Sequence, residues 1–142
     1  MLRPTTSIIV TLNGMLKEPD EFFDEDDETA RIERILLSLE TIYDPVLYAG
    51  MLLSRLARTQ AFTEGNKRTA LAVGHFVLTF NKLDPLVFLP PDDEWLQETL
   101  VKAAMGADVE QELLEFMGSN FDSSLRDKQH KPKNRRSGGL AV

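Results

Sequence analysis

Apolar residues recur at three- and four-residue spacing along most of the chain, which is the pattern of helices with one buried face. The pattern predicts a helix over about 27–41 and a second over about 45–59, which is apolar on most sides and therefore expected to be buried. Asp44 and Pro45 mark the start of the second helix as its cap and its first-turn residue. A third helix is predicted over about 66–81.

The pattern is less regular in the following segment. Residues 83–89 are apolar but contain Pro85, so they are expected to form a packed connector with a short extended piece. Either Asp92 or Asp93 then caps a further helix, in which Trp95 is expected to face the core.

A last helix is predicted from its cap Asp108 to a stop at Gly118. Beyond it apolar residues almost vanish, and residues 122–142 contain six Lys and Arg but only two Asp. This composition predicts a basic disordered tail, residues 122–142, after a single domain, residues 1–121. The ordinary role of such a tail is that of a solvated terminus.

One β element is predicted, close to the N-terminus. Residues 7–17 contain two β-prone runs on either side of Asn13-Gly14, the favoured pair for a tight type I′ turn. The predicted fold class is therefore all-α: a compact helical bundle with a small N-terminal β-hairpin packed on it.

Composition narrows the classes of function. The 142 residues suffice for one domain with a real core, and the absence of Cys excludes disulfides and thiolate metal sites, as is typical of a cytoplasmic protein. No apolar run approaches the roughly 20 residues that span a bilayer, and the N-terminus lacks the layout of a signal peptide. The net charge of −7 argues against nucleic acid as the main ligand, so nucleic-acid binding is expected only weakly, through the basic tail.

The segment 59–70 runs directly into the third predicted helix and carries the candidate chemistry. Gly65 permits a sharp turn, and Asn66 is among the best N-cap residues. The first helical turn points backbone N–H groups and the positive end of the helix dipole out of the loop. Lys67 and Arg68 add two cations at the same end, an arrangement that predicts a phosphate cradle. An ordinary helix start with solvated charges is the alternative for these four residues.

The longer string, Thr-Gln-Ala-Phe-Thr-Glu-Gly-Asn-Lys-Arg-Thr-Ala, resembles the signature of the Fic/Doc family. In that signature a His, a Phe two residues on, an acid, Gly-Asn or Ala-Asn, Lys or Gly, and Arg form one continuous loop. The matching residues are Phe62, Glu64, Gly65, Asn66, Lys67, Arg68, Thr69 and Ala70. The chain departs from the signature at Gln60, which stands where the family has its catalytic His.

The resemblance implies transfer of part of ATP onto a hydroxyl of a protein target, with Mg²⁺ bridging the phosphates. In this reading Lys67 and Arg68 hold phosphates together with Asn66 and the amides near Gly65, and Glu64 orients Mg²⁺. The Phe62 ring fixes the loop from beneath, and the hairpin 7–17 is the flap that aligns the target. The family's His accepts the proton of the target hydroxyl. Gln60 has no useful basicity near neutral pH, so the resemblance implies a crippled enzyme.

Two residues place the chain nearer to the Doc branch, the toxins of toxin–antitoxin systems. Lys67 and Leu71 stand where AMP-transferring members have Gly and a second Arg. The Doc branch transfers phosphate, and elongation factor Tu is its known type of target. Residues 29–34 fail the last position of the family's self-inhibitory motif, so inhibition in trans by an antitoxin-like partner is expected.

Two other readings stay open. The chain is either a natural relative that keeps a nucleotide or partner site without transferring anything, or an all-helical interaction module with a fortuitous loop. His75 does not replace the missing base, because it lies about nine residues, or roughly 13 Å, along the third helix. It is expected to be a hydrogen-bonded core or boundary residue, and His130 is assigned no role.

Overall fold

The structure, a computed structural model, describes residues 1–16, 25–59 and 65–130, with side chains described for 1–16, 29–59 and 65–126. Within these ranges it contains helices and no strand, which confirms the all-α prediction for this part of the chain. The helices are α1 (Thr6–Leu16), α2 (Glu25–Ser38), α3 (Pro45–Arg58), α4 (Asn66–Phe80), α5 (Pro85–Phe88), α6 (Glu94–Ala104) and α7 (Glu110–His130). None of them is long and apolar enough to cross a membrane.

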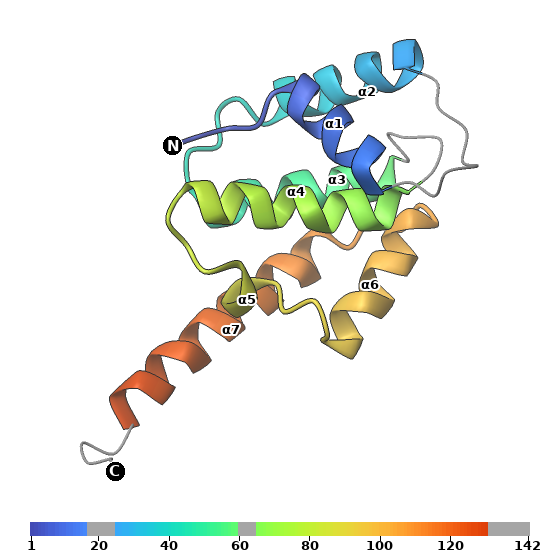
Figure 1. Ribbon diagram of the computed structural model, residues 1–142. Coiled ribbons are helices and arrows are strands. Elements are labelled where there is room, and N and C mark those ends of the chain that lie inside the picture. Colours follow the sequence, from blue (N-terminus) through green and yellow to red (C-terminus); the bar gives the residue numbers. More distant parts are fainter. Residues whose placement is uncertain (17–24, 60–64, 131–142) are drawn as a thin grey trace.

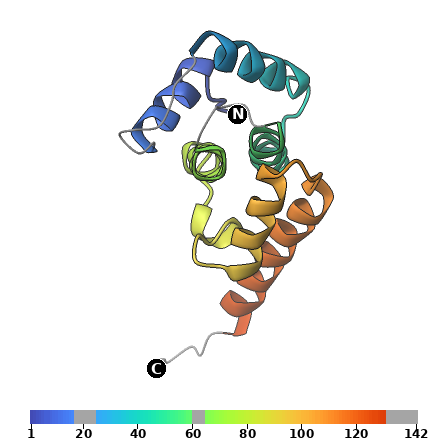
Figure 2. The same cartoon turned by 90° about the vertical axis from the view of Figure 1, so that its right-hand side faces the viewer.

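Helices α3 and α4 pack against each other and form the middle of the molecule (Figure 1). Helices α1 and α2 lie on one side of this pair, and α5, α6 and α7 lie on the other (Figures 1 and 2). Burial of α3 follows from its apolar sequence, as predicted. Its buried residues are Tyr48, Ala49, Gly50, Leu52, Leu53, Ser54, Leu56 and Ala57.

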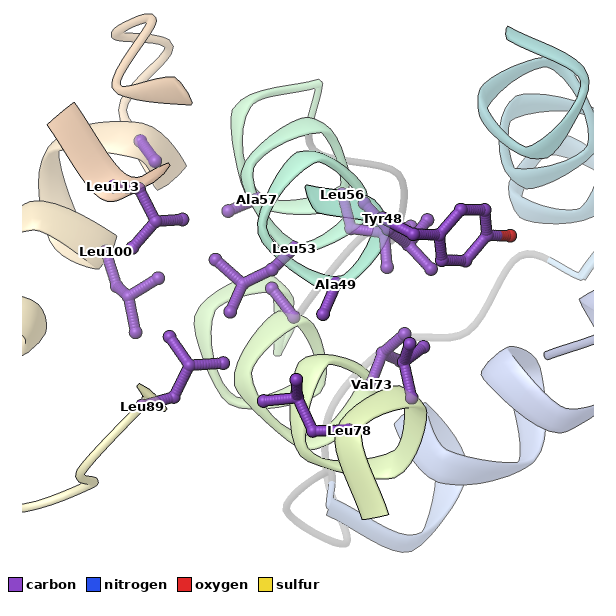
Figure 3. Packing of buried hydrophobic residues seen from close by; sticks show 14 of the residues in the cluster. Tyr48, Ala49, Leu53, Leu56, Ala57, Val73, Leu78, Leu89, Leu100 and Leu113 are labelled. Atoms are coloured by element: carbon purple, nitrogen blue, oxygen red, sulfur yellow. The ribbon is translucent and has the colours of Figure 1, made fainter. Parts of the chain in front are cut away.

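Two glycines allow the central helices to approach their neighbours closely. A Cβ on Gly50 of α3 would lie 2.6 Å from Leu114 Cδ2 of α7, and a Cβ on Gly74 of α4 would lie 2.9 Å from Leu53 Cδ1 of α3. Figure 3 shows Leu53 pointing from α3 toward Leu100 of α6, on the side away from α1. The core therefore holds α4 in a fixed position through contacts on both of its sides.

Aspartate caps set the starts of three helices. Asp44 Oδ1 accepts from the Val46 amide at 2.8 Å, and Asp93 Oδ1 accepts from the Leu96 amide at 2.8 Å, so both predicted caps are confirmed. Asp84 Oδ1 accepts from the Leu86 amide at 2.9 Å and starts α5. The extended piece predicted within 83–89 is therefore wrong, because Asp84-Pro85 is the same helix-start signal as Asp44-Pro45.

The predicted N-terminal β-hairpin over 7–17 is also wrong, because residues 6–16 form α1. The Thr5 hydroxyl accepts from the Ile8 amide at 3.2 Å and caps the first turn. Ile9 and Asn13 lie one turn apart and are buried, and α1 packs on α4 and α2. Gly14 does not have the positive φ that a type I′ turn requires. Burial of one helical face thus outweighs the β propensity of the Ile and Val residues.

The last helix continues past its predicted stop. Helix α7 passes through Gly118 and reaches His130, so residues 122–130 are helical rather than disordered. The Phe121 ring stacks on Phe88 of α5, with the ring centroids 5.5 Å apart, which extends the packed face beyond Gly118. Residues 131–142 of the predicted tail lie outside the described residues.

The predicted inward position of Trp95 is wrong. Its side chain is 41% exposed and lies on Phe116 of α7, with the two ring centroids 4.7 Å apart. The indole therefore covers the seam between α6 and α7 from outside, and Leu96, its neighbour in sequence, fills the core instead.

Candidate functional site

The candidate site is the first turn of α4, where four of the predicted site residues are consecutive. Gly65 precedes the helix in the left-handed conformation, with φ 76° and ψ 22°, and its carbonyl oxygen accepts from the Thr69 amide at 3.0 Å. Asn66, which was expected to cap the helix, is instead the first residue of α4. Gly65 occupies the cap position and has no side-chain oxygen to accept from the first-turn amides.

The charge at this turn is positive. By the geometry of any α-helix, the N–H groups of the first turn point out along the helix axis, together with the positive end of the dipole. Lys67 and Arg68 add two cations, both half-buried, and the first turn of α4 contains no acidic residue. A helix N-terminus with cations in its first turn is the kind of segment that binds anions, so the phosphate cradle at Lys67 and Arg68 stays a prediction.

A buried polar pair supports the turn from behind. Asn13 Nδ2 of α1 donates to Thr69 Oγ1 of α4 at 2.9 Å, and both residues are fully buried. This contact links α1 to the first turn of α4, across 56 residues of sequence. Sequence reasoning assigned Asn13 to a turn and missed this role. The available signal was the four-residue spacing from Ile9, which places an amide within an apolar stripe.

The remaining predicted site residues, Gln60, Phe62 and Glu64, lie outside the described residues. Helix α3 leads up to them and ends at Arg58, where the amide of its cap residue Thr59 donates to the Arg55 carbonyl oxygen at 3.0 Å. Within the part of the chain that the structure describes, no group of three or more His, Cys, Asp or Glu residues is arranged to hold a metal ion. The roles of Gln60 as the position of the base and of Glu64 as the Mg²⁺ ligand therefore stay predictions.

His75 lies apart from this turn, further along α4. Its Nε2 is 2.7 Å from the Leu89 carbonyl oxygen, so that nitrogen donates a hydrogen bond to the segment after α5. This confirms the prediction of a hydrogen-bonded boundary histidine.

Comparison with protein families gives one result that bears on this site. The family described as the Fic/DOC family matches residues 8–78, a span that begins within α1 and ends two residues before the end of α4. The match thus includes Asn13, the Gln60–Glu64 segment and the whole first turn of α4. Neither the curated proteins nor the solved structures give a match.

Proposed function

This chain belongs to the Fic/DOC family, and from that premise we propose that it binds ATP at the first turn of α4 and descends from enzymes that transfer part of ATP onto a protein hydroxyl. The observation that carries the proposal is the Gly65–Arg68 turn, which combines a left-handed glycine, a helix N-terminus and two cations. Phosphoryl transfer depends mainly on positioning and on neutralising phosphate charge, and this turn is suited to both.

Each residue of the turn has a distinct task in this proposal. Arg68 forms a planar fork that suits two phosphate oxygens, and Lys67 supplies a point charge. Asn66 and the neighbouring amides donate to the remaining oxygens. The Asn13–Thr69 hydrogen bond positions the turn and touches no substrate. Glu64 would hold Mg²⁺, which neutralises phosphate charge when it is bound together with ATP.

The residue at position 60 limits the chemistry. A Gln amide can hydrogen-bond to the target hydroxyl but cannot accept its proton near neutral pH. Loss of a general base costs about 10²- to 10⁴-fold in rate, so the protein with Gln60 is a very slow transferase.

Phosphate is the group we propose for transfer, rather than AMP. The AMP-transferring pattern has a second Arg where this chain has Leu71. Leu71 is half-buried and packs against the hydrophobic core, so this position supplies no second cation for the phosphates. We also propose that the target is a translation protein such as elongation factor Tu, as in the Doc branch that the sequence resembles. In this proposal the protein is a toxin, and an antitoxin-like partner inhibits it in trans.

The second candidate function is a retired member of the family that binds a nucleotide or a partner without transfer. Gln60 is the feature that favours it, because a natural replacement of the base would leave the phosphate cradle intact. The two candidates differ in whether a histidine at position 60 restores transfer.

The binding claim is tested by the melting temperature of the full chain with and without ATP and Mg²⁺. A ligand at 100 times its Kd stabilises the folded state by about 2.7 kcal/mol, which gives a clear upward shift. We expect Arg68→Ala to remove most of that shift. Lys102→Ala, a matched loss of an exposed cation on α6, should leave it unchanged. Equal shifts in both variants, or no shift in the parent protein, would contradict the assignment of the cradle.

A further inference from the structure

The five residues before α1 form a strap across one end of the molecule. Leu2 and Asn81 exchange two hydrogen bonds: the Leu2 amide donates to Asn81 Oδ1 at 2.8 Å, and Asn81 Nδ2 donates to the Leu2 carbonyl oxygen at 2.9 Å. Asn81 caps the C-terminal end of α4, where its Nδ2 also donates to the Val77 carbonyl oxygen at 2.8 Å. The strap is therefore fastened to the end of α4 that lies opposite Gly65.

Arg3 fastens the strap to the connection between α2 and α3. Its Nη1 and Nη2 donate to the Leu39 and Ile42 carbonyl oxygens at 3.0 and 2.6 Å. Its guanidinium also lies over the rings of Tyr43 and Tyr48, with Cζ 5.3 and 4.8 Å from their centroids. Leu39 directly follows α2, where the carbonyl oxygens of a helix end carry partial negative charge. Figure 1 shows the strap beside this connection, at the same end of the molecule as the last turn of α4.

The strap continues into α1 without slack. Pro4 is buried, and its ring fixes the backbone just before the helix. The Thr5 carbonyl oxygen accepts from the Ile9 amide at 3.1 Å, within the first turn that the Thr5 hydroxyl caps. Ile9 and Asn13 are the buried residues among the 11 of α1, and a free helix of that length is marginal in water. The position of α1 therefore depends on both of its ends: on the strap at one end and on the Asn13–Thr69 hydrogen bond at the other.

We propose that Arg3 is a positioning residue for the first turn of α4, because the strap keeps α1 docked and α1 carries Asn13 to Thr69. In this proposal α1 opens as one cooperative unit, and Asn13 leaves Thr69 when it does. The docking of α1 and the order of the turn are then coupled, so that stabilising one stabilises the other. The opening of α1 is a property of the fold, and only its effect on ATP rests on the proposed function.

Amide hydrogen exchange of the full chain measures this opening. Arg3→Ala removes two hydrogen bonds with a charged donor, so we expect exchange in α1 to rise at least about tenfold relative to exchange in α6. Exchange of the Thr69 amide, which donates to the Gly65 carbonyl oxygen, should rise with it. Arg3→Lys keeps the charge but not the planar fork, so its effect should be smaller than that of Arg3→Ala.

Two asparagines give a matched pair of variants. Asn81→Ala releases the strap from α4 and should also speed exchange in α1. Asn120→Ala removes an amide that donates to the Phe88 carbonyl oxygen on the other side of the molecule, and it should leave α1 unchanged. The proposal is overturned if exchange in α1 is the same in Arg3→Ala and Asn120→Ala, or if exchange rises in α1 but not at the Thr69 amide.

A second experiment adds ATP and Mg²⁺ to the parent protein. When ATP binds with α1 docked, a concentration of 100 times its Kd should slow exchange in α1 at least about tenfold, and Arg68→Ala should abolish this slowing. A rise in melting temperature with ATP but no slowing in α1 would contradict the coupling and leave ATP binding intact. A parent protein that does not bind ATP would contradict the proposed function, and the exchange of Arg3→Ala would still decide the role of the strap.

Discussion

At the scale of single residues, two buried polar side chains connect the N-terminal end of the chain to the central helices. Asn13 of α1 reaches the first turn of α4, and Tyr48 of α3 lies under the guanidinium of Arg3, whose Cζ is 4.8 Å from the ring centroid. Arg3 also donates to the Leu39 and Ile42 carbonyl oxygens just beyond α2, at 3.0 and 2.6 Å. Both contacts are specific enough to be tested individually.

Replacement of Asn13 by Ala should destabilise the protein, because it leaves the buried Thr69 hydroxyl without the Asn13 amide as its hydrogen-bond donor. The expected loss in the free energy of unfolding is about 1–3 kcal/mol, measured by urea titration. Thr11→Ala, an exposed change on the same helix, should cost less than about 0.5 kcal/mol. Equal effects of the two variants would show that the Asn13–Thr69 contact does not hold the turn.

Because of Tyr48, the free energy of unfolding should fall as the pH becomes alkaline. Burial raises the pKa of Tyr48 above its ordinary value of about 10, and this effect outweighs Arg3, which lowers the same pKa. Because the folded state favours the neutral phenol, this contribution to stability is complete below about pH 10 and is lost as the pH rises through the folded pKa.

The measurement is the free energy of unfolding of the parent protein and of Tyr48→Phe between about pH 8 and pH 11, a range around the tyrosine pKa. The parent protein should lose more stability than Tyr48→Phe over this range. Tyr43→Phe is the matched control, because Tyr43 is 73% exposed and should behave as the parent does. If Tyr48→Phe and the parent lose stability in parallel, burial of the phenol is not the cause.

At the scale of helices, the sequence predicted well those elements that combine an apolar stripe with a cap. Asp44-Pro45 and the apolar run after it define α3, and the Gly-Asn-Lys-Arg string defines the start of α4.

Prediction failed where a local signal conflicted with burial. Asn13-Gly14 is a turn signal in isolation, but in the fold Asn13 is buried against α4. Gly118 is a stop signal in isolation, but the stacking of Phe88 on Phe121 keeps α7 helical beyond it. Such contacts join residues far apart in the chain and cannot be read from local pattern.

Gly14→Ala and Gly118→Ala test these two helices directly. Apart from the backbone of its own helix, a Cβ added at either glycine would meet no atom of the described residues within 4 Å, so Ala fits both positions. In a helix interior each change should raise the free energy of unfolding by about 0.5–1 kcal/mol, because Ala has the higher helix propensity.

Gly65→Ala is the opposite case. Gly65 has a φ of 76°, which is unfavourable for any residue with a Cβ, so this variant should be less stable than the parent protein by about 1–2 kcal/mol. Thermal or urea unfolding of the three variants separates these outcomes. Destabilisation by Gly14→Ala would indicate a turn at residues 13–14 and contradict α1.

At the scale of the whole molecule, charge is distributed unevenly on an acidic chain. The net charge is −7, yet cations gather at the first turn of α4 and again around a cavity between α2, α3 and α7. Helix α3 lines this cavity with Arg55 and Arg58 and leads directly into the segment that contains Gln60. In our account the first place keeps the phosphate contacts of a Fic/DOC transferase, and only the proton acceptor is missing.

The most direct test of this account is transfer by the Gln60→His protein. The purified full chain is incubated with Mg²⁺, elongation factor Tu and ATP labelled at either the γ- or the α-phosphate, and label on the target is followed over time. We predict that Gln60→His transfers the γ-label about 10²- to 10⁴-fold faster than the parent protein. The Gln60→His/Arg68→Ala double variant should transfer neither label. Transfer of the α-label would mean that AMP, not phosphate, is moved. A Gln60→His protein that binds ATP but transfers neither label to this target or to another translation protein would contradict the account, and would leave a retired binding relative as the function.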